Sequence, residues 1–222
     1  MNNELIIKTD ILKISYTVQG LLKNNIYLIE SDGHACLIDP SCNEGKIVEF
    51  IGDANIDTIL LTHYHFDHIG AASYIKQKYN SCVYASKIDA PFIEGTKQLP
   101  VMHRRVKNCK CDTLLENNDE ITIGKITLKV IETPGHSLGS VCFYCEDTGL
   151  EKNTNKKIPV LFAGDTLFFS SCGRVDFEDS RPDLMEESLN KLAKLPSDTL
   201  VLPGHGQMTT ILHERSYMLK DR

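Results

Sequence analysis

Four side chains of the kinds that bind metal ions stand within six residues, directly after an apolar run. Residues 56–62 have the composition of a buried strand and lead into His63-Tyr-His65-Phe-Asp67-His68. In an extended chain, residues two apart point the same way, so His63 and His65 can hold one ion together. Asp67 and His68 follow on the next turn and can reach a second ion. Because buried imidazoles are costly to crowd without a cation, this pattern predicts a metal site.

Three further candidate ligands occur later, each beside a glycine where a predicted strand stops. They are His136 in T-P-G-H, Asp165 in A-G-D and His205 in P-G-H-G. Glycine lets the backbone approach closely, as a crowded pocket requires. Polar groups on loops at strand ends are typical of catalytic sites. Imidazole and carboxylate ligands suit zinc, iron or manganese, so we predict that these residues complete a site for two divalent ions.

The bulk composition is that of an ordinary globular protein and argues against two classes of partner. The net charge of −6 argues against a nucleic-acid-binding surface, which usually shows a basic stripe. No apolar run approaches the roughly 18 residues that cross a bilayer, and the N-terminus does not resemble a signal peptide. Eight cysteines without such a signal indicate a reducing compartment. We expect a cytoplasmic protein with no nucleic-acid and no membrane partner; the oligomeric state is not predicted.

Alternating strand-like and helix-like segments predict an α/β layered sandwich. The predicted strands cover residues 6–7, 11–18, 26–30, 35–38, 56–62, 81–85, 120–123, 125–132, 140–146, 160–163 and 199–202. The predicted helices cover residues 44–51, 69–79 and 184–195. Residues 92–113 show no clear period and are a candidate lid. This segment carries His103, Arg104 and Arg105, which form a basic patch or a solvated face, and the pair Cys109 and Cys111.

The motifs resemble those of the metallo-β-lactamase superfamily over nearly the entire chain. Within it, the chain is similar to the short bacterial branch of the glyoxalase II-like (hydroxyacylglutathione hydrolase-like) proteins. The shared segments are residues 133–140 and 164–168, Gly173-Arg174 with Asp176, residues 203–206, Thr209-Thr210 and His213-Glu214-Arg215. This resemblance implies a four-layer αββα sandwich.

The same resemblance implies a division of the ligands between two ions. Metal one would be held by His63, His65 and His136, metal two by Asp67, His68 and His205, and Asp165 would bridge them. The ions, Zn²⁺ with iron or manganese as alternatives, would lower the pKa of a shared water. The resulting hydroxide would attack a thioester carbonyl, with Asp67 and Asp165 as catalytic residues.

Two residues outside this set have possible roles. Arg174 is a candidate for binding a substrate carboxylate through its planar fork, or it forms a structural salt bridge. Asp39, at the end of a strand, supports a ligating imidazole or caps a turn.

The resemblance also bears on the substrate. Glyoxalase II carries a C-terminal helical domain that helps to bind glutathione, whereas this sequence ends 17 residues after His205. We therefore expect a single domain over residues 1–222, without that helical domain, acting on a small-molecule thioester of glutathione or a related thiol.

Three other functions remain open. A mononuclear iron persulfide dioxygenase of the same superfamily shares the pattern Cys172-Gly173-Arg174 with Asp176-Phe177. A lactonase of the superfamily is a second alternative. A redox or metal-storage protein built on the cysteines is a third, although only Cys109 and Cys111 stand close together in a polar stretch.

Overall fold

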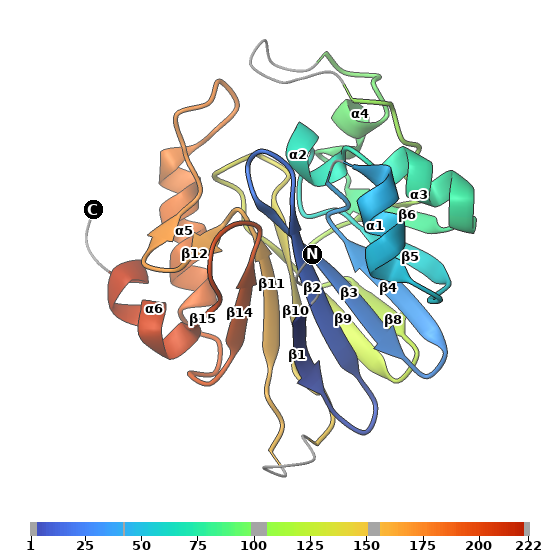
Figure 1. Cartoon of the computed structure of the whole chain (residues 1–222). Helices are drawn as coiled ribbons and strands as arrows, with labels where there is room; N and C mark the ends of the chain where they lie inside the picture. The colour runs from blue at the N-terminus through green and yellow to red at the C-terminus, as the bar shows by residue number, and fades with distance from the viewer. Residues whose placement is uncertain (1–3, 42, 99–105, 151–155, 220–222) are drawn as a thin grey trace.

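Two β-sheets lie face to face between helices in the computed structural model, which describes residues 4–41, 43–98, 106–150 and 156–219 (Figure 1). The first sheet has the strand order β1 (Glu4–Lys8), β2 (Lys13–Gln19), β3 (Asn24–Ser31), β4 (His34–Ile38), β5 (Ile56–Leu60), β6 (Cys82–Ser86) and β7 (Thr113–Leu115). The second has the order β15 (Thr209–Thr210), β14 (Leu200–Pro203), β11 (Val160–Gly164), β10 (Val141–Cys145), β9 (Ile126–Glu132) and β8 (Glu120–Ile123). A small hairpin joins β12 (Leu167–Phe168) and β13 (Ser171–Cys172).

Helices cover the outer face of each sheet. In Figure 1, α1 (Glu44–Ile51), α2 (Phe66–Ile69), α3 (Ala72–Tyr79) and α4 (Ala90–Ile93) lie on the side of the first sheet. On the opposite side, α5 (Pro182–Leu192) and α6 (Ile211–Met218) cover the second sheet. The predicted four-layer αββα sandwich is confirmed.

Three apolar clusters fill the three interfaces between these layers, and strand periodicity sorts side chains among them. On β3, Ile26 and Leu28 join the cluster that includes α1 and α3, whereas Tyr27 and Ile29 join the cluster between the sheets. Successive side chains of a strand point to opposite faces, so a strand covered on both faces reads as a continuous apolar run. The third cluster packs the second sheet against α5 and α6.

The structure departs from the predicted helix over residues 69–79. A break at residues 70–71 separates α2 from α3. A Cβ on Gly70 would lie 2.8 Å from the carbonyl oxygen of Ser41, so a glycine is needed where the chain passes this loop. The break leaves α2 as a short helix of its own, and this helix carries Asp67 and His68 of the histidine cluster. Six other elements were also not predicted: β7, β12, β13, β15, α4 and α6.

The predicted lid is only partly described. His103, Arg104 and Arg105 lie outside the described residues. Cys109 and Cys111 are buried in the cluster beneath α3, and burial raises their pKa values to about 11 and about 12. Their surroundings are therefore apolar, contrary to the polar stretch predicted. Within the described ranges, no helix combines the length and hydrophobicity that a bilayer span requires.

Candidate metal centre

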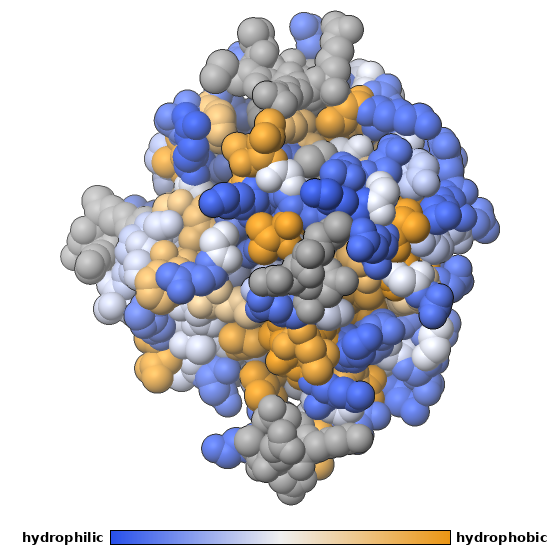
Figure 2. Space-filling view, in the orientation of Figure 1, coloured by the Kyte–Doolittle hydropathy of each residue, from blue (hydrophilic) through white to orange (hydrophobic). Residues whose placement is uncertain are grey.

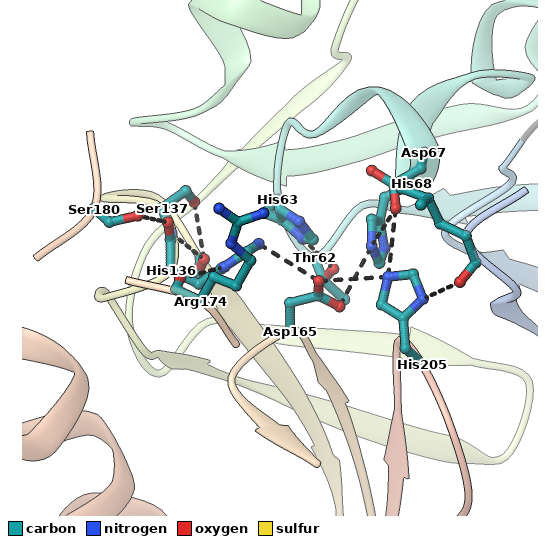
Figure 3. A network of polar contacts seen from close by, with 12 residues as sticks. Thr62, His63, Asp67, His68, His136, Ser137, Asp165, Arg174, Ser180 and His205 are labelled. Carbon is teal, nitrogen blue, oxygen red and sulfur yellow. Dashed lines mark hydrogen bonds and ion pairs between the residues drawn. The ribbon is translucent and has the colours of Figure 1, made fainter. Parts of the chain in front are cut away.

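The candidate ligands come from four segments that end at the same edge of the sandwich. His63, His65, Asp67 and His68 follow β5, while the other three follow β9, β11 and β14. Strands β11 and β14 pair in parallel, which sets Asp165 beside His205. The backbone N–H of Val141 donates to the carbonyl of Thr62 at 2.9 Å and joins the edges of the two sheets. Figure 3 shows the side chains converging from these segments.

Among the described residues, the potential ligand atoms form three groups, each spanning at most 4.8 Å. One joins Asp39 to His63 and His68. The other two share no residue: one is His63, His65 and His136, and the other is Asp67, His68 and His205. These are the same two trios that the sequence resemblance implied. Convergence of six residues from distant parts of the chain is what a dinuclear site requires.

Asp165 lies between the two groups. Its Oδ1 is 3.4 Å from Nε2 of His68, and its Oδ2 is 3.4 Å from Nε2 of His136 and 3.5 Å from Nε2 of His205. One carboxylate therefore reaches residues of both trios.

Hydrogen bonds at Nδ1 turn the opposite ring nitrogen toward the centre. Nδ1 of His136 donates to the carbonyl of Arg174 at 2.8 Å, and Nδ1 of His205 donates to the carbonyl of Leu22 at 2.9 Å. Because a carbonyl only accepts, the neutral ring carries its lone pair on Nε2. Nδ1 of His68 is bound in the same way by Asp39, at 2.8 Å.

Asp39 supports two of the imidazoles at once. Its carboxylate accepts from the backbone N–H of Thr62 at 2.8 Å, from the Thr62 hydroxyl at 2.6 Å and from His68. The hydroxyl proton is then committed to Asp39, so Oγ1 of Thr62 accepts from Nδ1 of His63, 3.0 Å away. Such partners fix ring orientation in metal sites.

Burial and neighbouring side chains shift the pKa values of several groups in the centre. Burial opposes ionisation of Asp165, but the neighbouring imidazoles His68 and His205 outweigh it and hold the pKa well below its usual value. Burial and the neighbouring imidazoles His68 and His65 hold the pKa of His63 well below its usual value. Burial lowers the pKa of His205, but hydrogen bonds to Asp165 and Asp67 overcome this and raise it to about 9.

The donor set fits divalent cations. Nε2 of His63 and Nε2 of His136 are buried and make no hydrogen bond to the described part of the chain. A buried ring nitrogen without a partner is costly, and an ion would satisfy it. Nitrogen and carboxylate donors in these numbers suit zinc, iron or manganese.

Glycines allow this crowding. A Cβ on Gly204 would lie 2.3 Å from Oδ1 of Asp165, and one on Gly173 would lie 1.9 Å from the Asp165 carbonyl oxygen. Any larger residue at either position would push Asp165 away from the centre.

Arg174 and its neighbours form one wall of the site. The Arg174 guanidinium is exposed, makes two hydrogen bonds of 2.9 Å to Asp176 and stacks over the ring of Phe177. Phe177 in turn lies edge-on to His65 and His136. The carboxylate-binding role of Arg174 stays a prediction, since here its fork faces Asp176.

The opposite wall is the turn between β2 and β3. Leu21 is 83% exposed and Leu22 is 53% exposed, beside the carbonyl that holds His205. Figure 2 shows hydrophobic surface where this turn lies in Figure 1. The mouth of the site therefore offers apolar surface to a substrate.

Sequence reasoning missed several residues that organise the centre. Asn24 donates to Asp67, and Asp89 accepts from both the backbone N–H of Tyr64 and the hydroxyl of Ser137. The only local signal for Asn24 was its place after a turn, since its partners are 43 or more residues away.

Comparison with known proteins identifies the family. The family model described as the metallo-β-lactamase superfamily matches residues 20–205. The chain belongs to the metallo-β-lactamase superfamily. Members of this superfamily are generally hydrolytic metalloenzymes, and the resemblance inferred from the motifs is confirmed.

Three similar proteins place the chain within the superfamily. A hydroxyacylglutathione hydrolase of Prochlorococcus marinus (strain MIT 9211) is 32% identical, over 93% of this chain and 75% of that protein. A crystal structure of the BLEG-1 B3 metallo-β-lactamase is 30% identical, with a TM-score of 0.77 over 93% of this chain and 100% of that chain. A crystal structure of TTHA1623 in a di-iron-bound form is 31% identical, with a TM-score of 0.69 over 90% of this chain and 96% of that chain.

Proposed function

We propose that this chain is a dinuclear metallohydrolase that cleaves a thioester of glutathione or a related thiol. The observation that carries the proposal is the position of Asp165 between two complete trios of ligands. The hydroxyacylglutathione hydrolase relative supports the thioester, and the di-iron form of TTHA1623 supports a pair of ions. Zinc is the proposed metal, with iron or manganese as alternatives.

The residues of the chain prepare a hydrolytic step. Two bound divalent ions supply a nucleophilic water at neutral pH and polarise the carbonyl to be attacked. Asp165 contacts both trios and holds them at a fixed separation. Asp67 presents a carboxylate oxygen that can accept a hydrogen bond from the attacking water and orient it. The Nδ1 hydrogen bonds of the histidines prevent the rings from turning as charge develops.

A thioester suits a site of this composition. A thiol has a pKa of about 8.5, so thiolate leaves without a strong general acid. Beyond the ligands, no acidic side chain needs to be assigned to protonate the leaving group. The exposed leucines of the β2–β3 turn provide contact area for an apolar part of the acyl or thiol group.

A persulfide dioxygenase is the main rival, and the second trio argues against it. Oxygen activation at a single iron uses two histidines and one carboxylate with open positions. Here Asp67, His68 and His205 are also assembled, with Nδ1 of both rings held by the chain. A β-lactam is a further candidate substrate because of the similarity to BLEG-1.

Replacing a ligand should abolish thioester hydrolysis and reduce bound metal below two equivalents. We expect this for His65→Ala and for Asp165→Ala, measured with lactoylglutathione and by elemental analysis of the same samples. His34→Ala is the matched control, because His34 is exposed, pairs with Asp57 and begins β4 at the end opposite Asp39.

The substrate panel should also include an acyl thioester of another thiol, a lactone, a β-lactam and glutathione persulfide with an oxygen electrode. An unaltered thioester rate in either ligand variant would refute the site. Oxygen consumption without thioester cleavage would show that the chain is a dioxygenase and not a thioester hydrolase.

A cytoplasmic location remains part of this proposal. Six cysteines of the described ranges are free, which is compatible with a reducing compartment. They are Cys36, Cys82, Cys109, Cys111, Cys142 and Cys145. A small-molecule thioester is the proposed partner, and nothing in the proposal calls for nucleic acid or a membrane.

A further inference from the structure

Asn24 is a buried polar residue that belongs to neither trio yet lies against the second one. It begins β3, directly after the exposed turn at residues 20–23, and its side chain is fully buried. Its backbone forms a β-bridge with His205 across the edge of the sandwich. The first residue of the strand is thus fixed beside the last candidate ligand in the sequence.

Neighbouring contacts hold this arrangement rigidly. The backbone N–H of Asn25 donates to the carbonyl of Gly204 at 2.8 Å, and its side-chain amide donates to the carbonyls of Pro203 and Gly206, both at 2.9 Å. The Tyr27 hydroxyl adds a hydrogen bond of 2.6 Å to the Pro203 carbonyl. These contacts tie β3 to the backbone of the His205 loop but touch no candidate ligand atom.

The Asn24 side chain differs, because its amide nitrogen reaches the ligand atoms themselves. Nδ2 lies 2.8 Å from Oδ2 of Asp67, 3.3 Å from Nε2 of His68 and 3.4 Å from Nε2 of His205. These are the three residues of the second trio. The shortest contact is a hydrogen bond to a carboxylate, the stronger kind.

The other end of the amide shows what sets its orientation. Oδ1 of Asn24 is buried and accepts no hydrogen bond from the described residues. A buried amide oxygen without a partner is costly, so no contact of the oxygen itself explains the orientation of the amide. The amide is oriented by the contacts of its nitrogen with the second trio.

We propose that Asn24 is a positioning residue of the second metal site, holding the Asp67 carboxylate against His68 and His205 so that their ligand atoms converge. This role rests on the proposed dinuclear function. Partners of this kind, which hold a ligand without binding the ion, typically change metal affinity by about 10–100-fold when removed.

The test is a titration of the metal-free, full-length protein with Zn²⁺ in competition with a chelator, repeated with Co²⁺ to follow its absorption spectrum. In Asn24→Ala and Asn24→Leu, the first equivalent should bind as in wild type, with the same Co²⁺ spectrum, and the second should bind at least about tenfold more weakly. The leucine variant nearly preserves side-chain volume, so equal losses in both variants identify the missing donor as the cause. Thermal unfolding of the metal-free variants verifies that they are folded.

Tyr27→Phe is the matched control. It removes one buried hydrogen bond between the same strand and the same loop, and it leaves the second trio untouched. We expect its second equivalent to bind as in wild type. A loss as large as that of the Asn24 variants would mean that general loosening of the loop is responsible, and would overturn the proposal.

Two further results separate this inference from the proposed function. If wild type binds two equivalents and both Asn24 variants bind them with unchanged affinity, the role of Asn24 is wrong and the dinuclear hydrolase stands. If wild type binds only one equivalent, the dinuclear function fails, and the role of Asn24 fails with it.

Discussion

Asp39 illustrates how one buried carboxylate can fix two imidazoles. Its carboxylate accepts a hydrogen bond directly from Nδ1 of His68 and is linked to His63 through the hydroxyl of Thr62. Both rings are thereby oriented before an ion arrives, one in each trio. The sequence offered two roles for this residue, support of an imidazole or a turn cap, and the hydrogen bonds match the first.

Asp39→Asn should weaken metal binding while leaving the chain folded. The asparagine keeps the shape and one acceptor, but its amide nitrogen cannot accept from either His68 or the Thr62 hydroxyl. We expect affinity for at least one ion to fall by about 10–100-fold, measured by chelator competition. Asp57→Asn is the control, because Asp57 serves only the exposed His34 among the histidines described. Affinity within about twofold of wild type would show that Asp39 is dispensable.

At the level of elements, α6 anchors the segment that follows α5. Arg215 on α6 donates to the carbonyls of Ala193 and Leu195 at 3.2 and 3.0 Å, and to the hydroxyl of Ser197 at 2.9 Å. These groups follow the last turn of α5, where carbonyls lack helical partners. The motif at residues 213–215, singled out in the sequence, therefore has a structural explanation at Arg215.

Arg215→Ala should destabilise the protein without altering metal uptake. The loss removes a charged donor from up to three acceptors, and hydrogen bonds to charged groups contribute about 1.5–3 kcal/mol. We expect the free energy of unfolding to fall by about 1–3 kcal/mol in urea denaturation. Arg181→Ala is the comparison, since Arg181 is exposed and pairs with Asp183, and a surface pair contributes about 0–1 kcal/mol. Equal effects of the two substitutions would contradict the anchoring role.

Sequence patterns located most strands and all seven candidate ligands because those signals are local. Apolar runs such as residues 35–38 and 160–163 mark strands buried on both faces, and the histidine cluster lies within one short segment. The break at Gly70 depends on the distant Ser41, and the position of α6 depends on the end of α5. Asn24 escaped notice for the same reason, because a polar residue at a strand end looks ordinary until His205 is seen beside it.

Asp89 joins segments from the two halves of the sandwich, and its burial carries a cost that depends on pH. It follows β6 of the first sheet and accepts from Ser137, which follows β9 of the second, and from the backbone of Tyr64. Burial raises the pKa of Asp89 to about 7, while an unfolded aspartate has a pKa of about 3.9. The carboxyl group of Asp89 therefore binds its proton more tightly in the folded chain than in the unfolded chain.

Because of this difference, the contribution of Asp89 to stability should be most favourable below about pH 4 and should decline as the pH rises to about 7. Asp89→Asn keeps an acceptor for the same two donors and cannot ionise. The free energy of unfolding of wild type, relative to this variant, should fall by roughly 4 kcal/mol between those pH values and then level off. Urea denaturation of both proteins, kept metal-free by a chelator, measures the difference. If the unfolding free energies of wild type and variant changed with pH in parallel, the Asp89 carboxyl would ionise as easily in the folded chain as in water. Its burial would then carry no pH-dependent cost.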